Sequence, residues 1–319
     1  MGYGSYSAAA HLEITKARAN VAQDALFAGR ECHSTMRPFG VKFRESRDSE
    51  AHPDSVGVVF ALDVTGSMGD IPVGLAKRTL PHFMTSVLEI LPSAQVMFMA
   101  LGNAHADRSP LQVGQFESEA GLIDQWLSRI HLEGGGGALG ESYDLAMRFA
   151  SRHTKMDCLE KRGKKGYLLM TGDEPPFSQL MAERVRAILG DPEQLDVPIH
   201  ETAREVLRSF HTFFFIPDPM RAARYDTQRT WFKIFHERVI VLDQPDDTAH
   251  AGALVIGIEE RKLVDEAAIA RHVEEKLHRT GRERDRLVKA VVPFALALAK
   301  GPIADVEEQG TRPYDPTPG

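Results

Sequence analysis

Oxygen-bearing side chains are concentrated in one short segment of the sequence, Asp-Val-Thr-Gly-Ser, which begins at Asp63. Alternate residues of an extended stretch point to the same side, so Asp63, Thr65 and Ser67 can converge with one carboxylate and two hydroxyl oxygens. Such oxygens suit a hard cation such as Mg²⁺, which takes about six oxygen ligands and keeps some of them as water. The segment therefore predicts a divalent-cation site. The alternative is a turn whose hydroxyl groups cap the next helix.

Two further segments carry donors of the same kind. The first is a glycine run at 134–137 that continues into Glu141 and Ser142. The second is Met-Thr-Gly-Asp-Glu followed by two prolines, in which Asp173 is the candidate ligand and Glu174 is its neighbour. A flexible loop with Ser142 capping a helix is the alternative at the first place. At the second it is a simple turn, with Glu174 facing solvent.

The elements around these segments alternate between strands and helices. Apolar runs predict buried strands, with a short edge strand at 111–116; the buried ones are 56–62, 96–101, 166–171, 212–216 and 238–242. Apolar stripes at helical spacing predict helices at 8–30, 71–91, 122–130, 142–152, 201–210, 228–236, 249–280 and 283–299. The last helix should break or kink at Pro293. This alternation predicts an α/β fold: a doubly wound, mostly parallel sheet with helices on both faces and helical additions at both ends of the chain.

The polar segments stand where such a fold binds ligands. Asp63 directly follows the strand at 56–62, and Asp173 closely follows the strand at 166–171. In a doubly wound sheet, ligands bind in the crevice at the carboxyl ends of the strands. Three separate loops that bring oxygen atoms to one crevice are stronger evidence for a bound ion than any one loop alone.

Together the segments ALDVTGSMG, LEGGGGALGES and LLMTGDEPP resemble a von Willebrand factor type A (vWA) domain with a metal-ion-dependent adhesion site (MIDAS), of the intracellular bacterial type. The resemblance covers roughly residues 55–242 and implies a Rossmann-like fold. It places Asp63, Thr65 and Ser67 on the metal through the family pattern Asp-x-Ser/Thr-x-Ser.

The other two loops depart from the family pattern in one respect each. Asp173 matches the family's last acidic residue, but the order here is Thr-Gly-Asp where Thr-Asp-Gly is usual. Many members have Thr in the middle loop, and this chain has none there. The resemblance therefore implies that Glu141 or Ser142 substitutes, as in relatives with a glycine run followed by Glu.

What the resemblance implies about function is recognition. In the family the protein leaves one coordination position of the metal open, and an acidic side chain of a protein partner fills it. The likeness also implies work with a MoxR-like AAA+ ATPase in a bacterial remodelling or defence system. The expected ion is Mg²⁺, with Mn²⁺ and Ca²⁺ as the other candidates. Two alternatives are a metal-dependent phosphoesterase that uses the same oxygen atoms and a metal-free structural scaffold.

Spacing argues against several enzyme classes. A haloacid-dehalogenase-like phosphatase needs Asp where Thr65 stands and an acidic residue where Phe177 stands. The nucleophile elbow Gly-x-Ser-x-Gly lacks its first glycine, and no Gly-Lys-Ser/Thr closes the glycine run into a phosphate loop. No His or Cys pair has zinc-ligand spacing. We therefore expect no catalytic residues and a binding protein rather than an enzyme.

Composition sets the class of protein. A net charge of −7 over 319 residues gives no indication of nucleic acid or of an anionic membrane as partner. No apolar run approaches the roughly 20 residues that span a bilayer. Two cysteines cannot form a disulfide framework and no signal peptide is visible, so we expect a cytoplasmic protein.

We expect four regions along the chain. They are an N-terminal helix and charged linker (1–54), the vWA domain (55–242), a C-terminal helical extension packed on it (243–301) and a flexible tail (302–319). The charged residues from Arg44 onward should form a solvated linker, with a brace or a docking surface as the alternative. Asp243, Asp246 and Asp247 should lie in a solvated loop. Core packing is expected for the apolar face of the last helix, which carries Leu287, Val288, Val291, Val292 and Leu296.

Overall fold

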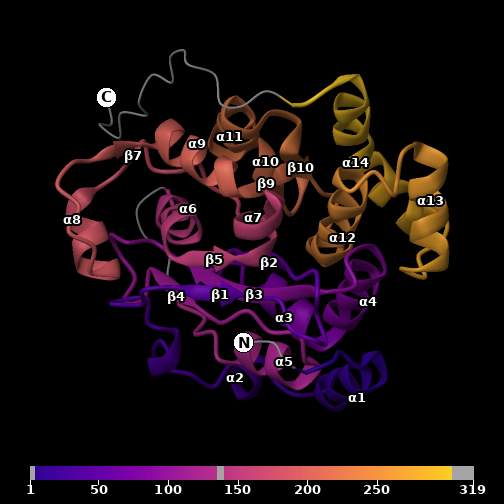
Figure 1. The fold of residues 1–319 in the computed structure, drawn as a ribbon, viewed down its shortest axis with the longest axis horizontal. Helices are drawn as coiled ribbons and strands as arrows, with labels where there is room; N and C mark the ends of the chain where they lie inside the picture. Colours follow the sequence, from indigo (N-terminus) through magenta and orange to yellow (C-terminus); the bar gives the residue numbers. More distant parts are fainter. Residues whose placement is uncertain (1–3, 135–139, 304–319) are drawn as a thin grey trace.

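The computed structural model describes residues 4–134 and 140–303, and its centre is a six-stranded sheet (Figure 1). The strand order is β10-β9-β6-β2-β3-β4, and every pair is parallel except β3 with the edge strand β4. In chain order the strands are β2 (Val56–Asp63), β3 (Ala94–Leu101), β4 (Leu111–Val113), β6 (Gly166–Thr171), β9 (Phe210–Ile216) and β10 (Val239–Val241). The predicted α/β class with a mostly parallel, doubly wound sheet is confirmed.

The chain leaves the middle of the sheet in two directions. It begins with β2, moves outward through β3 to β4, then returns to place β6 on the other side of β2 and moves outward again to β9 and β10. β2 and β6 therefore form the switch point, where diverging loops leave a crevice at the carboxyl ends of the strands. Because Ala61 of β2 is in register with Met170 of β6, the residues that follow these two strands emerge side by side.

Helices cover both faces of the sheet, and two short strand pairs complete the fold. The helices are α1 (Ala8–Arg18), α2 (Gln23–Leu26), α3 (Asp70–Gly74), α4 (Leu80–Ile90), α5 (Ala120–Ser128), α6 (Tyr143–Arg152), α7 (Asp157–Arg162), α8 (Ala182–Arg184), α9 (Ile199–Ser209), α10 (Pro219–Ala223), α11 (Thr227–Phe235), α12 (Thr248–Glu259), α13 (Glu266–Glu275) and α14 (Arg282–Lys300). A π-helical turn at Leu75–Thr79 joins α3 to α4. The strand pairs are β1 (Arg44–Ser46) with β5 (Thr154–Met156), and β7 (Gln179–Leu180) with β8 (Val197–Pro198).

Strand β9 shows what packs on each face, because neighbouring residues of a strand point to opposite sides. Phe213 meets Phe294 of α14 edge-on, with ring centroids 4.9 Å apart. Phe214 faces the other way, where it stacks on Trp231 of α11 at 3.9 Å and contacts Tyr143 of α6 at 5.2 Å. The C-terminal helix α14 therefore covers one face, and α6 and α11 cover the other.

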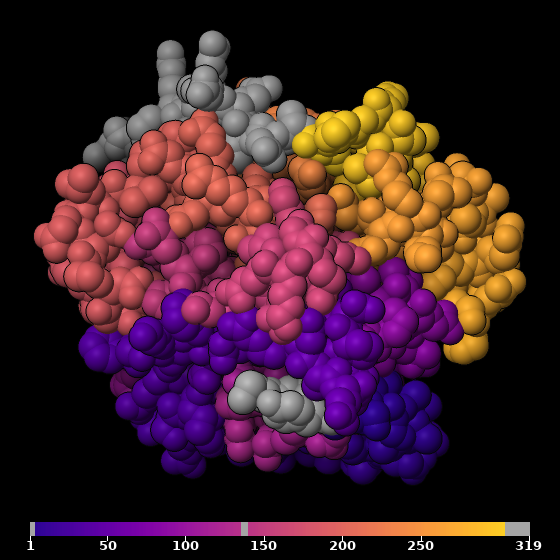
Figure 2. Space-filling model, in the orientation of Figure 1, coloured from indigo at the N-terminus to yellow at the C-terminus, as the bar shows by residue number. Residues whose placement is uncertain are grey.

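Gly252 brings α12 close to the same face as α14. A β-carbon at this position would lie 3.1 Å from Leu169 of β6 and 3.4 Å from Phe83 of α4. In Figure 2 the orange and yellow C-terminal residues accordingly lie directly against the violet N-terminal half of the molecule. The C-terminal helices are thus packed on the sheet and its α4 layer.

Two of the expected helices are interrupted. The run expected at 249–280 stops at Glu259, because Arg261 adopts a left-handed backbone (φ 57°) and Asp265 then caps α13. The run expected at 8–30 is divided into α1 and α2. In contrast, α14 continues through Pro293 as one helix. Of the tail expected from 302 onward, residues 304–319 lie outside the described part of the chain.

The residues expected to form a charged, solvated linker are instead built into the fold. β1 pairs with β5, and Arg47 donates a hydrogen bond to Asp157 at 2.7 Å. Asp48 forms an ion pair with Arg162 at 2.8 Å, and hydrogen bonds from Arg162 hold the pKa of Asp48 well below its usual value. The prediction was wrong because charge density in a sequence does not distinguish solvated charges from paired ones.

The loop after β10 is solvated at Asp243 and Asp246, as expected, but not at Asp247. Asp247 is buried and pairs with Arg286 of α14, with 3.0 Å between Oδ1 and Nη2. On α14 itself Leu287 and Val291 are buried as expected, whereas Leu296 is 59% exposed. The apolar face of the last helix is therefore core along most, but not all, of its length.

Two further observations concern membrane-spanning helices and the pairing of the cysteines. No helix within the described ranges has both the length and the apolar character needed to cross a membrane. Cys32 and Cys158 are both buried and unpaired with each other.

We expect Asp247→Ala to lower the free energy of unfolding by about 1–3 kcal/mol, because it leaves the largely buried guanidinium of Arg286 without its counter-charge. The matched control is Asp246→Ala, which breaks an exposed pair with Arg78 and should cost about 0–1 kcal/mol. Urea unfolding of both variants provides the measurement. Equal losses in the two variants would contradict the anchoring role of Asp247.

Candidate metal site

Asp63, the last residue of β2, is fully buried at the switch point. Its Oδ1 accepts hydrogen bonds from the amide and the hydroxyl of Thr65, at 3.0 and 2.6 Å. Its Oδ2 accepts a hydrogen bond from the Tyr143 hydroxyl at 3.0 Å. The amide of Asp63 donates to Oγ1 of Thr171 at 3.2 Å, which ties β2 to the end of β6. The carboxylate is therefore held in place by donors from its own loop and from α6.

Asp173 lies two residues beyond the end of β6 and has no comparable support. Its side chain is buried, with 1% of the residue exposed, yet neither carboxylate oxygen has a hydrogen-bond partner among the residues that the structure describes. Nε of Arg221 lies 3.6 Å from Oδ2, which is an ion pair but too long for a good hydrogen bond. The backbone of Asp173 is fixed, because its carbonyl accepts a hydrogen bond from Thr227 at 3.0 Å. A buried carboxylate of this kind needs a cation or another donor to offset its desolvation.

In the middle loop, residues 135–139 of the glycine run lie outside the described chain, and the two candidate ligands that follow behave differently. The Ser142 hydroxyl accepts a hydrogen bond from the amide of Ala104 at 2.9 Å, and it does not cap α6 although it stands at the N-cap position. Glu141 is buried, and its Oε2 has no hydrogen-bond partner within 4–134 and 140–303. Burial raises the pKa of Glu141, and the neighbouring Asp63 raises it further. Glu141 is therefore the side chain that interacts with the other carboxylates.

The two hydroxyl candidates of the first segment also differ. Thr65 is buried and donates its hydroxyl hydrogen to Asp63, so its lone pairs remain free to accept or to ligate. Ser67 is exposed, and its main-chain carbonyl accepts a hydrogen bond from Arg221. Asp63, Thr65, Glu141 and Asp173 are thus buried in the loops at the strand ends, whereas Ser67 is exposed.

Several carboxyl groups lie close together at these strand ends, and their burial favours the protonated form of some of them. Burial raises the pKa of Asp63, and the charge of Asp173 raises it further. Glu174, for which solvent exposure was the simple expectation, instead accepts a hydrogen bond from the amide of Gly140, and burial raises its pKa as well. Carboxyl groups whose pKa values are raised by burial and by one another are typical of functional sites.

The chemical type of these donors, carboxylate and hydroxyl oxygens, fits a hard divalent cation. Within 4–134 and 140–303, no group of three or more His, Cys, Asp or Glu side chains meets the geometry of a metal site by itself. Mg²⁺, however, is usually bound through one or two carboxylates with water completing its shell. The oxygens of Asp173 and Glu141 that lack partners among the described residues, together with the hydroxyl of Thr65, are ligands of that type.

Tyr143 belongs to the site, but no expectation from the sequence named it. Tyr143, the first residue of α6, is fully buried and donates to Asp63. Gly172 makes room for it: a β-carbon at 172 would lie 2.1 Å from the Tyr143 hydroxyl. This close approach gives a physical reason for Gly immediately before Asp173, in the order Thr-Gly-Asp. An aromatic residue directly after a loop ligand, where the next helix starts, is the signal that could have pointed to Tyr143.

Arg221 was also missed, although it contacts two of the predicted loops. It follows β9, whose carboxyl end lies beside that of β6. The carboxyl ends of parallel strands meet at one edge of the sheet. Applied to the strand that becomes β9, this rule would have predicted that the loop carrying Arg221 lies next to the site.

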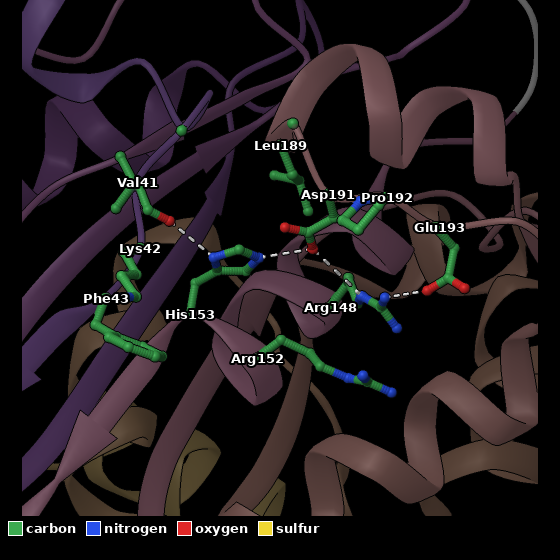
Figure 3. Close-up of a pocket in the computed structure, with 12 residues that line it drawn as sticks. Val41, Lys42, Phe43, Arg148, Arg152, His153, Leu189, Asp191, Pro192 and Glu193 are labelled. Carbon is green, nitrogen blue, oxygen red and sulfur yellow. Dashed lines mark hydrogen bonds and ion pairs between the residues drawn. The ribbon is translucent and has the colours of Figure 1, made fainter.

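A cavity of about 650 Å³ lies at the other end of α6 from Tyr143 (Figure 3). His153 lies in it between the carbonyl of Val41 at 2.8 Å and Oδ2 of Asp191 at 2.9 Å. Arg148, also at this wall, pairs with Glu193. These charged groups pair with one another, and none of the predicted site residues lines this cavity.

Comparisons with known proteins add little to this geometry. No protein-family model matches the sequence, and no curated protein matches it. Among solved structures, the chain is similar to the pilus adhesin SpaC from Lactobacillus rhamnosus GG in its open conformation, with a TM-score of 0.41 and 13% identity over 68% of this chain and 30% of the adhesin. A second form of the same adhesin gives a TM-score of 0.39 and 12% identity over 68% and 31%. The chain spans less than a third of the adhesin, and a likeness this distant does not indicate what the chain does.

We expect Gly172→Ala to destabilise the protein by about 1–3 kcal/mol, because the added methyl group would overlap the buried Tyr143 ring and its hydroxyl. Adding Tyr143→Phe should recover part of the loss, since it removes the atom in closest contact. Urea unfolding of the single and double variants tests this. A Gly172→Ala protein as stable as the wild type would show that Tyr143 does not occupy this space.

The raised pKa of Asp63 predicts how stability changes with pH in metal-free buffer. The unfolded chain releases the Asp63 proton near pH 4, whereas the folded chain retains it to higher pH. The stabilisation associated with this proton is thus complete below about pH 4 and is lost as pH rises through the raised pKa. We expect Asp63→Asn to gain stability relative to wild type by about 1–3 kcal/mol between about pH 5 and about pH 8. Urea unfolding in EDTA at both pH values measures the difference in unfolding free energy between Asp63→Asn and the wild type. A difference that does not change with pH would contradict the raised pKa of Asp63.

Proposed function

We propose that this protein is a metal-dependent binding module of the vWA type, which holds a divalent cation, Mg²⁺ first, and captures an acidic residue of a protein partner. The observation that carries the proposal is Asp173: a buried carboxylate without a hydrogen-bond partner in the described part of the chain, next to Asp63 at the switch point of the sheet. A cation at this position would compensate the charge of Asp173, which Arg221 at 3.6 Å offsets only in part.

Each residue has a role that its contacts support. Asp63 and Asp173 would provide the charged ligands, and Thr65, Ser67 and Glu141 are the further candidates. Ser142 has the weaker claim, because its hydroxyl accepts from the amide of Ala104. Tyr143 and the Thr65 amide orient the Asp63 carboxylate, so that it is held ready for an ion. When bound, the cation would supply an open coordination position for an incoming carboxylate.

The partner follows from this chemistry and from the resemblance of the three loops to MIDAS loops. A surface Asp or Glu of another protein is the ligand that a partly hydrated Mg²⁺ would accept. We further propose that the protein acts in the cytoplasm with a MoxR-like AAA+ ATPase, as an adaptor that presents a target for remodelling. Mass spectrometry of proteins retained with Mg²⁺ and released by EDTA tests this part of the proposal.

We expect Asp63→Asn to weaken Mn²⁺ binding at least about 100-fold, which corresponds to about 2.7 kcal/mol, while the fold is retained. The amide is nearly isosteric and can still accept the hydrogen bonds of Thr65. Isothermal titration calorimetry of metal-stripped protein with Mn²⁺ measures the change, and EDTA should abolish partner capture by the wild type in parallel.

Asp70→Asn is the matched control, because Asp70 is an exposed carboxylate a few residues further along the same segment. It should bind Mn²⁺ as the wild type does. If the wild-type protein binds neither Mn²⁺ nor Mg²⁺, the proposed function fails and a metal-free scaffold remains. If it instead hydrolyses phosphoesters and Asp63→Asn loses that turnover, the phosphoesterase alternative replaces it.

A further inference from the structure

The guanidinium of Arg221 bridges two of the loops that carry the candidate metal ligands. Its Nε lies 3.6 Å from Oδ2 of Asp173, and its Nη2 donates a hydrogen bond to the main-chain carbonyl of Ser67. A third contact joins Nη1 to Oδ2 of Asp218, at 3.3 Å. One positive charge of the protein itself is thus placed at the mouth of the crevice, between the loops that follow β2 and β6.

The local sequence explains why this side chain faces the crevice. Asp218 caps α10 by accepting a hydrogen bond from the amide of Arg221 at 2.9 Å, and Pro219 occupies the first turn of that helix. The loop between β9 and α10 emerges beside the end of β6. The side chain of Arg221 is 22% exposed, so most of its surface is in contact with protein.

We propose that Arg221 is the internal counter-cation of the site and that it competes with the divalent ion for Asp173, so that it sets the metal affinity. The inference rests on the proposed function, because it assigns a regulator to the same site. A guanidinium keeps its charge at every accessible pH, so it repels any divalent cation that binds the carboxylate it pairs with. Asp218 offers the displaced guanidinium a second carboxylate within reach, so the side chain need not lose all its partners when an ion binds.

Competition and simple structural support predict different results. If Arg221 only holds the loops in place, removing it should weaken metal binding or leave it unchanged. If it competes, removing its charge should lower the stability of the metal-free protein and tighten metal binding at the same time. Lower stability without metal together with tighter metal binding would identify Arg221 as a competing cation.

The test uses the full-length, metal-stripped protein and Mn²⁺ alone as the probe. Arg221→Met keeps the apolar stem of the side chain and removes the charge. We expect it to bind Mn²⁺ at least about fivefold more tightly in calorimetric titration, and to melt at a lower temperature than wild type in EDTA. Arg221→Lys keeps the charge and should bind Mn²⁺ within about twofold of the wild type.

Arg229→Ala is the control for net charge. Arg229 lies in the neighbouring helix α11, is 73% exposed and pairs with Asp226, so its removal should leave Mn²⁺ affinity unchanged. Equal or weaker Mn²⁺ binding by Arg221→Met would overturn the role of Arg221 while the proposed function stands. Equal tightening by Arg229→Ala would also overturn it, since a general change in charge would then explain the gain. If none of the four proteins binds Mn²⁺, both proposals fail together.

Discussion

The burial of several carboxyl groups in one crevice is the constraint on which the rest of this structure depends. Asp63, Glu141 and Asp173 are all nearly or completely buried, and their charges raise the pKa values of Asp63 and Glu141 beyond what burial does alone. Such an arrangement costs folding free energy unless donors or cations offset it. The donors for Asp63 come from Thr65 and from Tyr143 on α6, while the charge of Asp173 faces Arg221.

The packing around the crevice serves to hold these donors in place. The Tyr143 ring is enclosed by Phe214 and Trp231, and the indole of Trp231 also donates a hydrogen bond to the main-chain carbonyl of Glu174. The aromatic layer between β9 and α11 therefore fixes the phenol above Asp63 and the loop after β6 at the same time. Because Gly172 leaves no side chain in the way, the phenol approaches the strand ends closely.

The sequence predicts features that depend on neighbouring residues better than features that depend on contacts between distant parts of the chain. The apolar runs that end at Asp63 and just before Asp173 predicted both the strands and the neighbouring positions of those residues, because a buried parallel strand has a clear local pattern. Tyr143 and Arg221 were missed, because their roles arise only from contacts between loops far apart in the chain. Charge density did not predict which charged residues form ion pairs in the folded protein. Helical periodicity did not predict where a helix ends when a single left-handed residue, such as Arg261, ends it.

The separation of the two central strands along the chain affects when the crevice can exist. The amide of Asp63 and the hydroxyl of Thr171 meet across the sheet although 108 positions separate them, and that interval includes β3, β4, α4, α5 and α6. Pairing of such distant segments is intrinsically slow, because the entropy cost of closing the long loop precedes the gain from the contacts. During synthesis on the ribosome, a nascent chain that has not yet released β6 therefore cannot join Asp63 to Thr171, so this end of the sheet is assembled only after β6 has emerged.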